Sequence, residues 1–452
     1  MRRRNNPILT LLIVLFCLVL LALAGYMLVQ VLPQKAPQEV TTIETNSVFE
    51  SDGQTVEPDR EQAYEGDLPS GVDTTPEPEP DTPSEPDAPE ESSSENALIS
   101  ADADKRARET LASMTEDEKI WQLFYVTPEL LTGVETATRA GDSTKEALEA
   151  MPVGGIIYFA KNLEDHTQSV EMLSNTKSYA KIPLFLGVDE EGGTVSRVGS
   201  NPDMGVPSVG DMRSLGKQQD PAAAYAAGQD IGGSLHALGF NLDFAPVADV
   251  AQGADSVIGS RSFGSDPELC ASLAGVIVKS LRAEGIVSCL KHFPGYGSAT
   301  VDDHNGTSIV EKTLSELEGC DLVPFQSIIA SEGSVPFVMV SHLSYPNVTG
   351  SDTPADLSAS IVTDILRDKL DYQNVIITDS HSMASITDHY SAGDAAVKAL
   401  AAGCDMILMP SDLQAAFDAV KAAVADGTLS QARIDESVLR ILTVKAEYGI
   451  IS

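Results

Sequence analysis

Acidic, basic and imidazole side chains recur at or just past the ends of short apolar runs in this sequence. Carboxyl and imidazole groups transfer protons, and histidine does so near neutral pH. If the runs are parallel strands of a barrel, their carboxyl ends meet at one face and bring these groups into one site. We therefore expect catalysis at these positions, which are Asp189, Glu190, Asp249, Lys291, His292, His342, Asp379 and His381.

The elements that must position these groups lie in residues 97–452. Short apolar runs alternate there with polar loops and helix-like stretches, which is typical of βα units around a parallel sheet. The candidate strands are 123–126, 154–159, 184–188, 241–246, 288–292, 337–341, 375–378 and 405–409. Helices are expected between and after them, for example over 222–238, 270–284, 358–370 and 431–448. Eight such units predict an α/β fold of the (β/α)₈ TIM-barrel type.

The first 33 residues predict a membrane anchor. Three arginines, Arg2 to Arg4, precede an almost uninterrupted apolar run over 8–31, and about 20 such residues span a bilayer. The positive-inside rule places the arginines in the cytoplasm and the rest of the chain outside a single-pass helix. Ala22-Leu23-Ala24 also fits the cleavage site of a signal peptide, which would make the protein secreted. The apolar run continues beyond that site, and this favours the anchor.

Residues 34–96 predict a disordered linker. They are rich in proline, glutamate, serine and threonine and poor in large apolar side chains, so they cannot bury enough surface to offset chain entropy. Their acidic groups contribute much of the formal net charge of −38, which argues against a nucleic-acid partner. The remaining segment, 97–452, is then the catalytic barrel, and we expect it to be monomeric.

The cysteines give no support for a metal-thiolate site. Cys270, Cys289, Cys320 and Cys404 lie beside or near apolar runs without close pairing, and small buried thiols are favoured over two disulfides. No C-x-x-C spacing occurs, and no His-x-His pair follows an early strand as barrel metal-hydrolases require. We expect neither a metal nor a cofactor.

Four strings in order resemble one known family. The most specific is KHFPGYG at 291–297, followed after four residues by DDH at 302–304. The others are GVDEEGGTVSR at 187–197, IGSRSF at 258–263 and TDSHSM at 378–383. Together they resemble glycoside hydrolase family 3 in its β-N-acetylhexosaminidase branch, over nearly all of 98–451. The resemblance implies a retaining, exo-acting enzyme that removes terminal N-acetylglucosamine-type residues through a covalent glycosyl-enzyme.

The same resemblance implies roles for individual residues. Asp379 is expected to be the nucleophile beneath the anomeric carbon. His304, oriented by Asp302, is expected to be the acid/base, since an imidazole gives up and regains a proton near neutral pH. His342 is left between a supporting role and none, while His381 stands at a variable position of its motif, where the absence of a role is favoured. The residues expected to bind the sugar hydroxyls and acetamido group are Asp189, Arg197, Arg261, Lys291 and His292.

Departures from the family pattern bear on specificity. Glu190 stands where glutamine is common, Thr194 where arginine is frequent, Tyr296 in place of histidine and Asp303 in place of serine. None of them removes an expected catalytic group.

Several other activities stay open. A β-glucosidase or xylosidase of the family usually takes its acid/base from a second domain, and a glycoside phosphorylase would use phosphate in place of water. A membrane-tethered sugar-binding protein without activity would need no nucleophile. The anchor and linker would place the site outside the cell, where peptidoglycan fragments are the expected glycan.

Overall fold

The computed structural model describes the chain from residue 91 onward, with side chains from residue 101. The described ranges are 91–253, 256–299, 308–331 and 335–451. The chain divides into two compact units, 1–85 and 86–452, and only the second falls within the described residues. Among the helices of this part of the chain, none has the length and apolar character needed to cross a membrane. The predicted anchor at 1–33 lies outside the described residues, as does the predicted linker up to residue 90.

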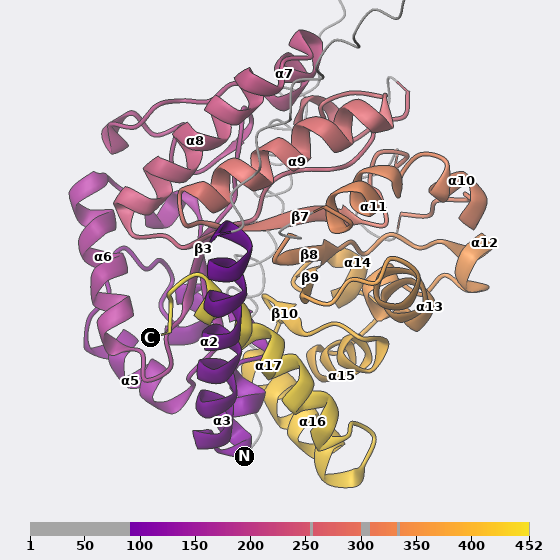
Figure 1. Ribbon diagram of the computed structural model, residues 1–452. Coiled ribbons are helices and arrows are strands. Elements are labelled where there is room, and N and C mark those ends of the chain that lie inside the picture. The colour runs from indigo at the N-terminus through magenta and orange to yellow at the C-terminus, as the bar shows by residue number, and fades with distance from the viewer. Residues whose placement is uncertain (1–90, 254–255, 300–307, 332–334, 452) are drawn as a thin grey trace, which may run out of the picture. The chain divides into compact units, whose positions relative to one another are not determined.

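Eight parallel strands close into a barrel at the centre of the described unit (Figure 1). Around the barrel they pair in the order β1, β10, β9, β8, β7, β6, β3 and β2. Their bounds are Phe124–Val126, Gly155–Tyr158, Phe185–Val188, Leu242–Asp243, Val287–Phe293, Phe337–Val340, Val375–Ser380 and Met406–Leu408 for β1, β2, β3, β6, β7, β8, β9 and β10. The predicted (β/α)₈ barrel is confirmed, and each predicted strand overlaps an observed one.

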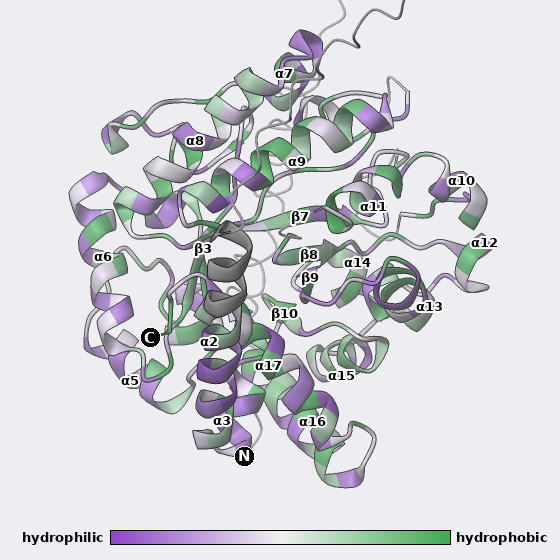
Figure 2. Ribbon diagram, in the orientation of Figure 1, coloured by the Kyte–Doolittle hydropathy of each residue, from purple (hydrophilic) through white to green (hydrophobic). Residues whose placement is uncertain are grey.

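Helices surround the barrel, and many begin after an aspartate, serine or threonine whose side chain accepts a backbone N–H of the first turn. The longer ones are α5 (Asp142–Ala150), α6 (His166–Tyr179), α8 (Pro221–Leu238), α9 (Pro267–Ala283), α15 (Ala392–Ala402), α16 (Leu413–Asp426) and α17 (Gln431–Glu447). Asp220, Asp266 and Ser430 cap α8, α9 and α17 in this way. Figure 2 shows mainly apolar residues on the central strands and mixed polar and apolar residues on the helices, as expected for helices that bury one face.

Shorter helices complete the described unit. They are α3 (Glu116–Trp121), α4 (Pro128–Thr132), α7 (Met212–Gln218), α10 (Leu314–Glu318), α11 (Val323–Ile329), α12 (Pro346–Thr349), α13 (Ala359–Ile361) and α14 (Ala384–Thr387). Two features differ from the sequence prediction. The helix expected over 358–370 is α13 continued by a π-helical segment, η6 (Val362–Lys369), and an unpredicted hairpin joins β4 (Glu190–Gly192) to β5 (Val195–Ser196).

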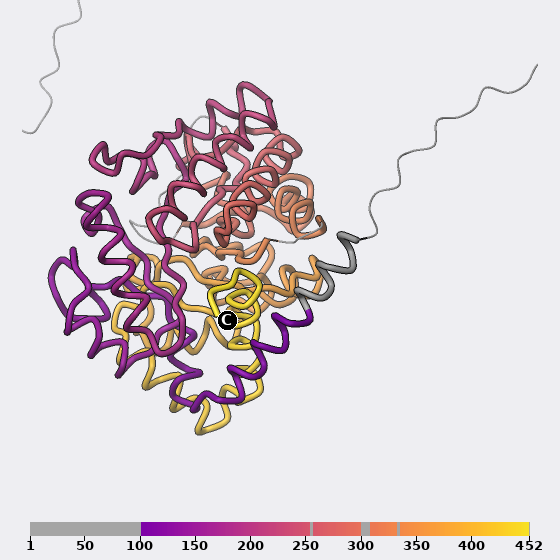
Figure 3. Tube along the Cα trace, turned by 60° about the vertical axis from the view of Figure 1, so that its left-hand side comes forward, coloured from indigo at the N-terminus to yellow at the C-terminus, as the bar shows by residue number. Residues whose placement is uncertain are grey.

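The first described helix packs along the last one. Helix α2 (Glu91–Ser113) lies beside α17 in both views, and Arg106 donates a hydrogen bond to the carbonyl of Ala446 over 3.1 Å (Figures 1 and 3). The predicted boundary between linker and barrel, at residues 96 and 97, falls within α2.

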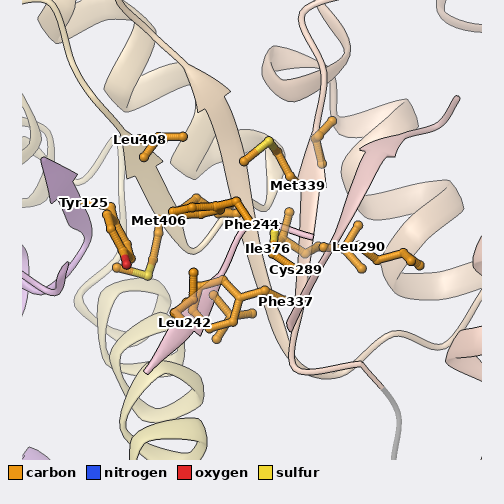
Figure 4. Packing of buried hydrophobic residues seen from close by; sticks show 14 of the residues in the cluster. Tyr125, Leu242, Phe244, Cys289, Leu290, Phe337, Met339, Ile376, Met406 and Leu408 are labelled. Atoms are coloured by element: carbon orange, nitrogen blue, oxygen red, sulfur yellow. The ribbon is translucent and has the colours of Figure 1, made fainter. Parts of the chain in front are cut away.

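Large side chains from the strands fill the barrel interior. Tyr125 is fully buried and meets Phe244 edge to face at 5.1 Å (Figure 4). A Cβ at Gly155 would lie 2.4 Å from the Tyr125 ring, and one at Gly187 would lie 2.2 Å from its hydroxyl. Strands β2 and β3 therefore need glycine at these two positions, because Tyr125 fills the space that their side chains would occupy.

The cysteines agree with the expectation of buried thiols. Cys270, Cys289, Cys320 and Cys404 are all free, and every one except the partly exposed Cys320 is buried.

A buried carboxylate ties the last helix to the barrel. Asp405 is fully buried and pairs with Arg367 of η6 and with Arg433 and Arg440 of α17, the latter over 3.1 Å. Ser437 donates a further hydrogen bond to it over 2.6 Å. Burial raises the pKa of Asp405, but the arginines outweigh that effect and hold it below the usual value. Asp405 is therefore charged at neutral pH and balances the arginines around it.

Replacing Asp405 with asparagine should lower the free energy of unfolding by about 3 kcal/mol or more, because the arginines lose their shared anion. Denaturant unfolding followed by circular dichroism measures this. Glu436→Gln is the matched control, since Glu436 also binds Arg440, over 2.6 Å, but its side chain is 52% exposed. The control should cost less than about 1 kcal/mol. Equal losses in the two variants would contradict this assignment.

Candidate active site

A cavity of about 570 Å³ opens among the carboxyl ends of the strands. In (β/α)₈ barrels, active sites lie at this carboxyl end of the strands. Six of the residues predicted from the sequence line it, namely Asp189, Arg197, Arg261, Lys291, His292 and Asp379. The structure thus brings these side chains together, although they come from four separate segments of the chain. The predicted acid/base pair, Asp302 and His304, lies outside the described residues.

The buried carboxylate of Glu191 joins two of the cations that face this cavity. Arg261 binds both of its oxygens over 2.8 Å, and the Lys291 ammonium lies 2.6 Å from one of them. Burial raises the pKa of Glu191, but Lys291 and Arg261 overcome that effect and lower it to about 2. Glu191 is therefore ionised at neutral pH, and it holds both cations in place.

Lys291 also binds a carboxylate that is open to the cavity. Its ammonium lies 2.8 Å from Asp189, whose side chain is 17% exposed, while that of Lys291 is only 3% exposed. Burial lowers the pKa of Lys291, but Asp189 and Glu191 raise it by more, so the net shift is upward. Lys291 remains a cation and presents its charge to the cavity beside an acceptor. Such a pair suits hydroxyl groups, which both donate and accept hydrogen bonds.

Asp249 orients His292 within the wall of the cavity. The His292 Nδ1 lies 2.7 Å from Asp249 Oδ2, and Asp249 Oδ1 also accepts the backbone N–H of Tyr296 over 2.6 Å. The other ring nitrogen, Nε2, lies 3.4 Å from the Arg261 guanidinium. Lys291 and His292 are consecutive residues of β7 that both line the cavity, at a point where the pairing of β7 with β8 is irregular. Asp249 thus fixes the ring where it faces the cavity.

Asp379 lies near the end of β9 and is charged. The backbone N–H of Ser380 donates to its Oδ1 over 2.7 Å. Burial raises the pKa of Asp379, but the nearby His292 and His342, this N–H group and Lys291 together hold it below its usual value. A carboxylate kept ionised at the base of a polar cavity can stabilise, or bond to, a cationic carbon.

The hairpin of β4 and β5 carries Arg197 into the cavity. Glu190 organises this hairpin, because its Oε2 accepts the N–H groups of Arg197 and Val198, both over 2.7 Å. Its Oε1 accepts the Gly199 N–H over 3.1 Å and the Ser196 hydroxyl. Both carboxylate oxygens serve only as acceptors, which explains glutamate here: a glutamine would present an NH₂ donor to one pair of these donors.

Sequence reasoning missed some of the residues on which this arrangement depends. Glu191 lies inside a quoted motif, yet its role as the shared anion was not predicted. Asp249 was recognised by position but was given no role. Asp356 follows no strand end and left no signal, although it contacts both His342 and His381, which lie behind Asp379 and not among the residues lining the cavity.

Fold and site define the class of (β/α)₈-barrel proteins with a polar ligand site at the strand ends. The model of the glycosyl hydrolase family 3 N-terminal domain matches residues 115–444. The chain therefore belongs to glycosyl hydrolase family 3.

Relatives with sequence and structural similarity agree with this assignment. The chain is 34% identical over 333 residues to beta-hexosaminidase A of Pseudoalteromonas piscicida, an alignment that covers 67% of this chain and 54% of that protein. It is 37% identical over 273 residues to beta-hexosaminidase LpqI of Mycobacterium tuberculosis, covering 58% and 68% of the two chains. The chain thus spans little more than half of the first relative.

A solved structure of a family 3 beta-N-acetylglucosaminidase from Paenibacillus has the same fold. It superposes with a TM-score of 0.70 at 34% identity, covering 75% of this chain and 63% of the other. A family 3 glycosyl hydrolase from Mycobacterium smegmatis superposes with a TM-score of 0.65 and is covered over 98% of its length.

Replacing Glu190 with glutamine should weaken ligand binding through the hairpin. Two of the four donors would face an NH₂ group, and each unsatisfied donor costs about 1 kcal/mol or more. We expect the KM for an aryl glycoside cleaved by the wild type to rise about fivefold or more, by displacement of Arg197, with kcat changed by less than about twofold. Ser196→Ala removes only one of the four contacts and should have a smaller effect. A wild-type KM in Glu190→Gln would refute this role.

Proposed function

We propose that the protein is a retaining, exo-acting β-N-acetylhexosaminidase that releases terminal N-acetylglucosamine-type residues. The observation that carries the proposal is the ionised Asp379 in a closely spaced set of charged side chains, within a cavity at the strand ends. The two curated relatives described above are named beta-hexosaminidases, which supports the N-acetylated sugar as substrate.

The wall of the cavity supplies the groups for sugar recognition. Asp189 accepts hydrogen bonds from hydroxyls, while Lys291, Arg261 and Arg197 donate to hydroxyl and carbonyl oxygens. The Arg197 guanidinium also lies 5.8 Å from the centre of the Phe159 ring, and both side chains line the cavity. Because Lys291 and Arg261 are already bound to Glu191, little reorganisation is required when a sugar enters.

Two carboxyl-assisted steps form the proposed mechanism. Asp379 attacks the anomeric carbon and forms a glycosyl ester while an acid protonates the departing oxygen. Water then cleaves the ester, and the same group, now a base, removes its proton. We assign the role of this acid and base to His304, with Asp302 as its partner, because of the motif at 302–304. An imidazole suits both directions of the transfer, since it titrates near neutral pH.

The proposed place of action is the outer face of a bacterial membrane. The apolar segment within 1–33 would anchor the chain, and the acidic linker would hold the barrel at a distance from the bilayer. Peptidoglycan fragments with a terminal N-acetylglucosamine are the glycans that such a position favours. Recovery of the protein in the soluble fraction after osmotic lysis, with its amino-terminus intact, would overturn the anchor.

Asp379→Asn in the full-length protein should reduce kcat on a chromogenic N-acetylglucosaminide by about a thousandfold or more, because the amide cannot form the ester. Asp388→Asn is the matched control, since Asp388 is exposed and lies nine positions further along the chain. Substantial activity in Asp379→Asn would refute the nucleophile assignment.

Substrate comparison tests the branch of the family. The wild type should hydrolyse the N-acetylglucosaminide faster than the corresponding glucoside. A relative from Cellulomonas fimi, 30% identical over 353 residues, is named a beta-N-acetylglucosaminidase/beta-glucosidase, so both substrates must be measured together. Preference for the glucoside would overturn the proposed specificity. A sugar 1-phosphate formed in phosphate buffer would show that the enzyme is a phosphorylase and would overturn hydrolysis as its reaction.

A further inference from the structure

A buried cluster lies directly behind the proposed nucleophile. His342 follows β8, Asp356 belongs to the short helix η5 (Ala355–Leu357), and His381 follows β9. Their side chains are at most 1% exposed. One oxygen of Asp356 lies 3.1 Å from His342 Nδ1, and its other oxygen lies 2.8 Å from His381 Nε2. One carboxylate therefore contacts two imidazole rings.

The contacts of His342 define its protonation state. Its Nε2 lies 2.9 Å from the carbonyl oxygen of Ser380, and a carbonyl only accepts, so Nε2 carries a proton. Its Nδ1 faces Asp356, whose pKa is lowered to about 2 because His342 and His381 outweigh the effect of burial. The two atoms lie at ion-pair distance, 3.1 Å, without hydrogen-bond geometry. A lone pair on Nδ1 would be repelled by the carboxylate oxygen that it faces, so we assign a proton to Nδ1 as well. With both ring nitrogens protonated, His342 is an imidazolium.

His381 is neutral by the same reasoning. Its Nε2 donates to Asp356 over 2.8 Å, while its buried Nδ1 has no hydrogen-bond partner. Burial lowers the pKa of His381 more than Asp356 raises it. Asp356 thus balances one cation, and the three side chains together carry no net charge.

The cluster holds the turn that carries Asp379. His342 fixes the carbonyl of Ser380, and the N–H of the same residue donates to Asp379 over 2.7 Å. On the far side of the turn, the backbone N–H of His381 donates to Leu408 over 2.9 Å. A displacement of His342 would therefore reach the Asp379 carboxylate through one residue.

We propose that Asp356 maintains His342 as a buried imidazolium and that His342 is a positioning residue, which orients Asp379 and stabilises its negative charge. The inference rests on the proposed function, in which Asp379 is the nucleophile. It extends that function, since neither His342 nor Asp356 lines the cavity. The lowered pKa of Asp379, to which His342 contributes, agrees with this arrangement.

Other charged or titratable groups surround the cluster and enter the same balance. Asp379 faces it from β9, and Lys291 and His292 act on Asp379 from β7. On the opposite side Cys404 donates to the Asp356 carbonyl over 3.4 Å, and Asp356 raises the pKa of Tyr390 in addition to the effect of burial. None of these groups makes the contact to the Ser380 carbonyl that His342 makes.

The three side chains also meet the spacing of a metal site, with donor atoms within 4.8 Å of one another. In a tetrahedral zinc site with bonds near 2.0 Å, neighbouring donor atoms are about 3.3 Å apart. The contacts of 2.8 and 3.1 Å are shorter, and each involves a different oxygen of Asp356. A hydrogen bond with His381 and an ion pair with His342 fit these distances better than a shared metal ion.

The test uses His342→Gln and Asp356→Asn in the full-length protein. Glutamine can still donate to the Ser380 carbonyl but carries no charge, and asparagine removes the anion that holds the proton on His342. Both variants should lower kcat about tenfold or more, with KM within about twofold. The acid limb of the pH profile of kcat/KM, where activity falls as Asp379 is protonated, should move to a pH about one unit higher. The reason is that Asp379 loses a nearby cation and its pKa rises.

Cys404→Ser is the matched control. Cys404 is fully buried and donates to the backbone of Asp356, a contact that a serine hydroxyl preserves. The acid limb of the pH profile of kcat/KM in Cys404→Ser should coincide with that of the wild type. If both cluster variants fail to fold, nitrogen NMR of histidine-labelled wild type still decides, since it contains only seven histidines. Two protonated ring nitrogens on His342 at neutral pH support the proposal, and a neutral ring overturns it.

The outcomes separate the inference from the proposed function. One outcome is that His342→Gln and Asp356→Asn keep the wild-type kcat and pH profile while Asp379→Asn is inactive. That outcome would overturn only the positioning role of His342. Activity in Asp379→Asn would overturn the nucleophile and the inference with it. Stoichiometric zinc in the purified wild type, lost in Asp356→Asn, would replace the imidazolium with a metal site and overturn the proposal.

Discussion

The carboxylate of Glu191 is the interaction on which the rest of the site depends. A buried anion is costly unless it is paired and hydrogen-bonded, and Glu191 meets this condition only when Arg261 and Lys291 converge on it. These partners are 70 and 100 positions further along the chain. The loop that carries Arg261 and the strand β7 that carries Lys291 must therefore come together with Glu191 as the barrel closes. Once there, the two cations face the cavity in fixed positions, which is the preorganisation that a polar ligand requires.

The cations also determine which carboxylates of the barrel are charged. The buried Glu191 and the half-buried Asp379 have lowered pKa values because positive groups surround them. Asp243 is buried nearby, and its pKa is raised well above the usual value, mainly by burial. Similar burial thus shifts the pKa values of Glu191 and Asp243 in opposite directions, and the difference lies in the position of each group relative to Lys291 and Arg261. The negative charge is kept where it faces the cavity.

Much of the fold was predictable from the sequence. Strands buried on both faces are continuous apolar runs, which is why each predicted strand overlaps an observed one. The β4–β5 hairpin was not predicted because Glu190, rather than an apolar pattern, organises it. The π-helical segment within 358–370 was not predicted either, since its apolar spacing resembles that of an ordinary helix.

The site was predictable to a different extent. Side chains at strand ends, such as Lys291 and Asp379, were found because barrel geometry alone brings them together. The pairing of Glu191 with Arg261 and the contacts of Asp356 depend on how loops meet in space, which spacing along the chain does not reveal. The acid/base pair, Asp302 and His304, rests on its motif alone, because it lies outside the described residues.

Covalent trapping tests the central claim most directly. The full-length protein would be incubated with an activated fluorinated N-acetylglucosaminide, which forms the glycosyl ester but hydrolyses slowly, and its peptides would be examined by mass spectrometry. The account predicts one sugar on the peptide that contains Asp379 and none on the same peptide of Asp379→Asn. A label on another residue, or turnover that inverts the anomeric configuration without any label, would contradict it.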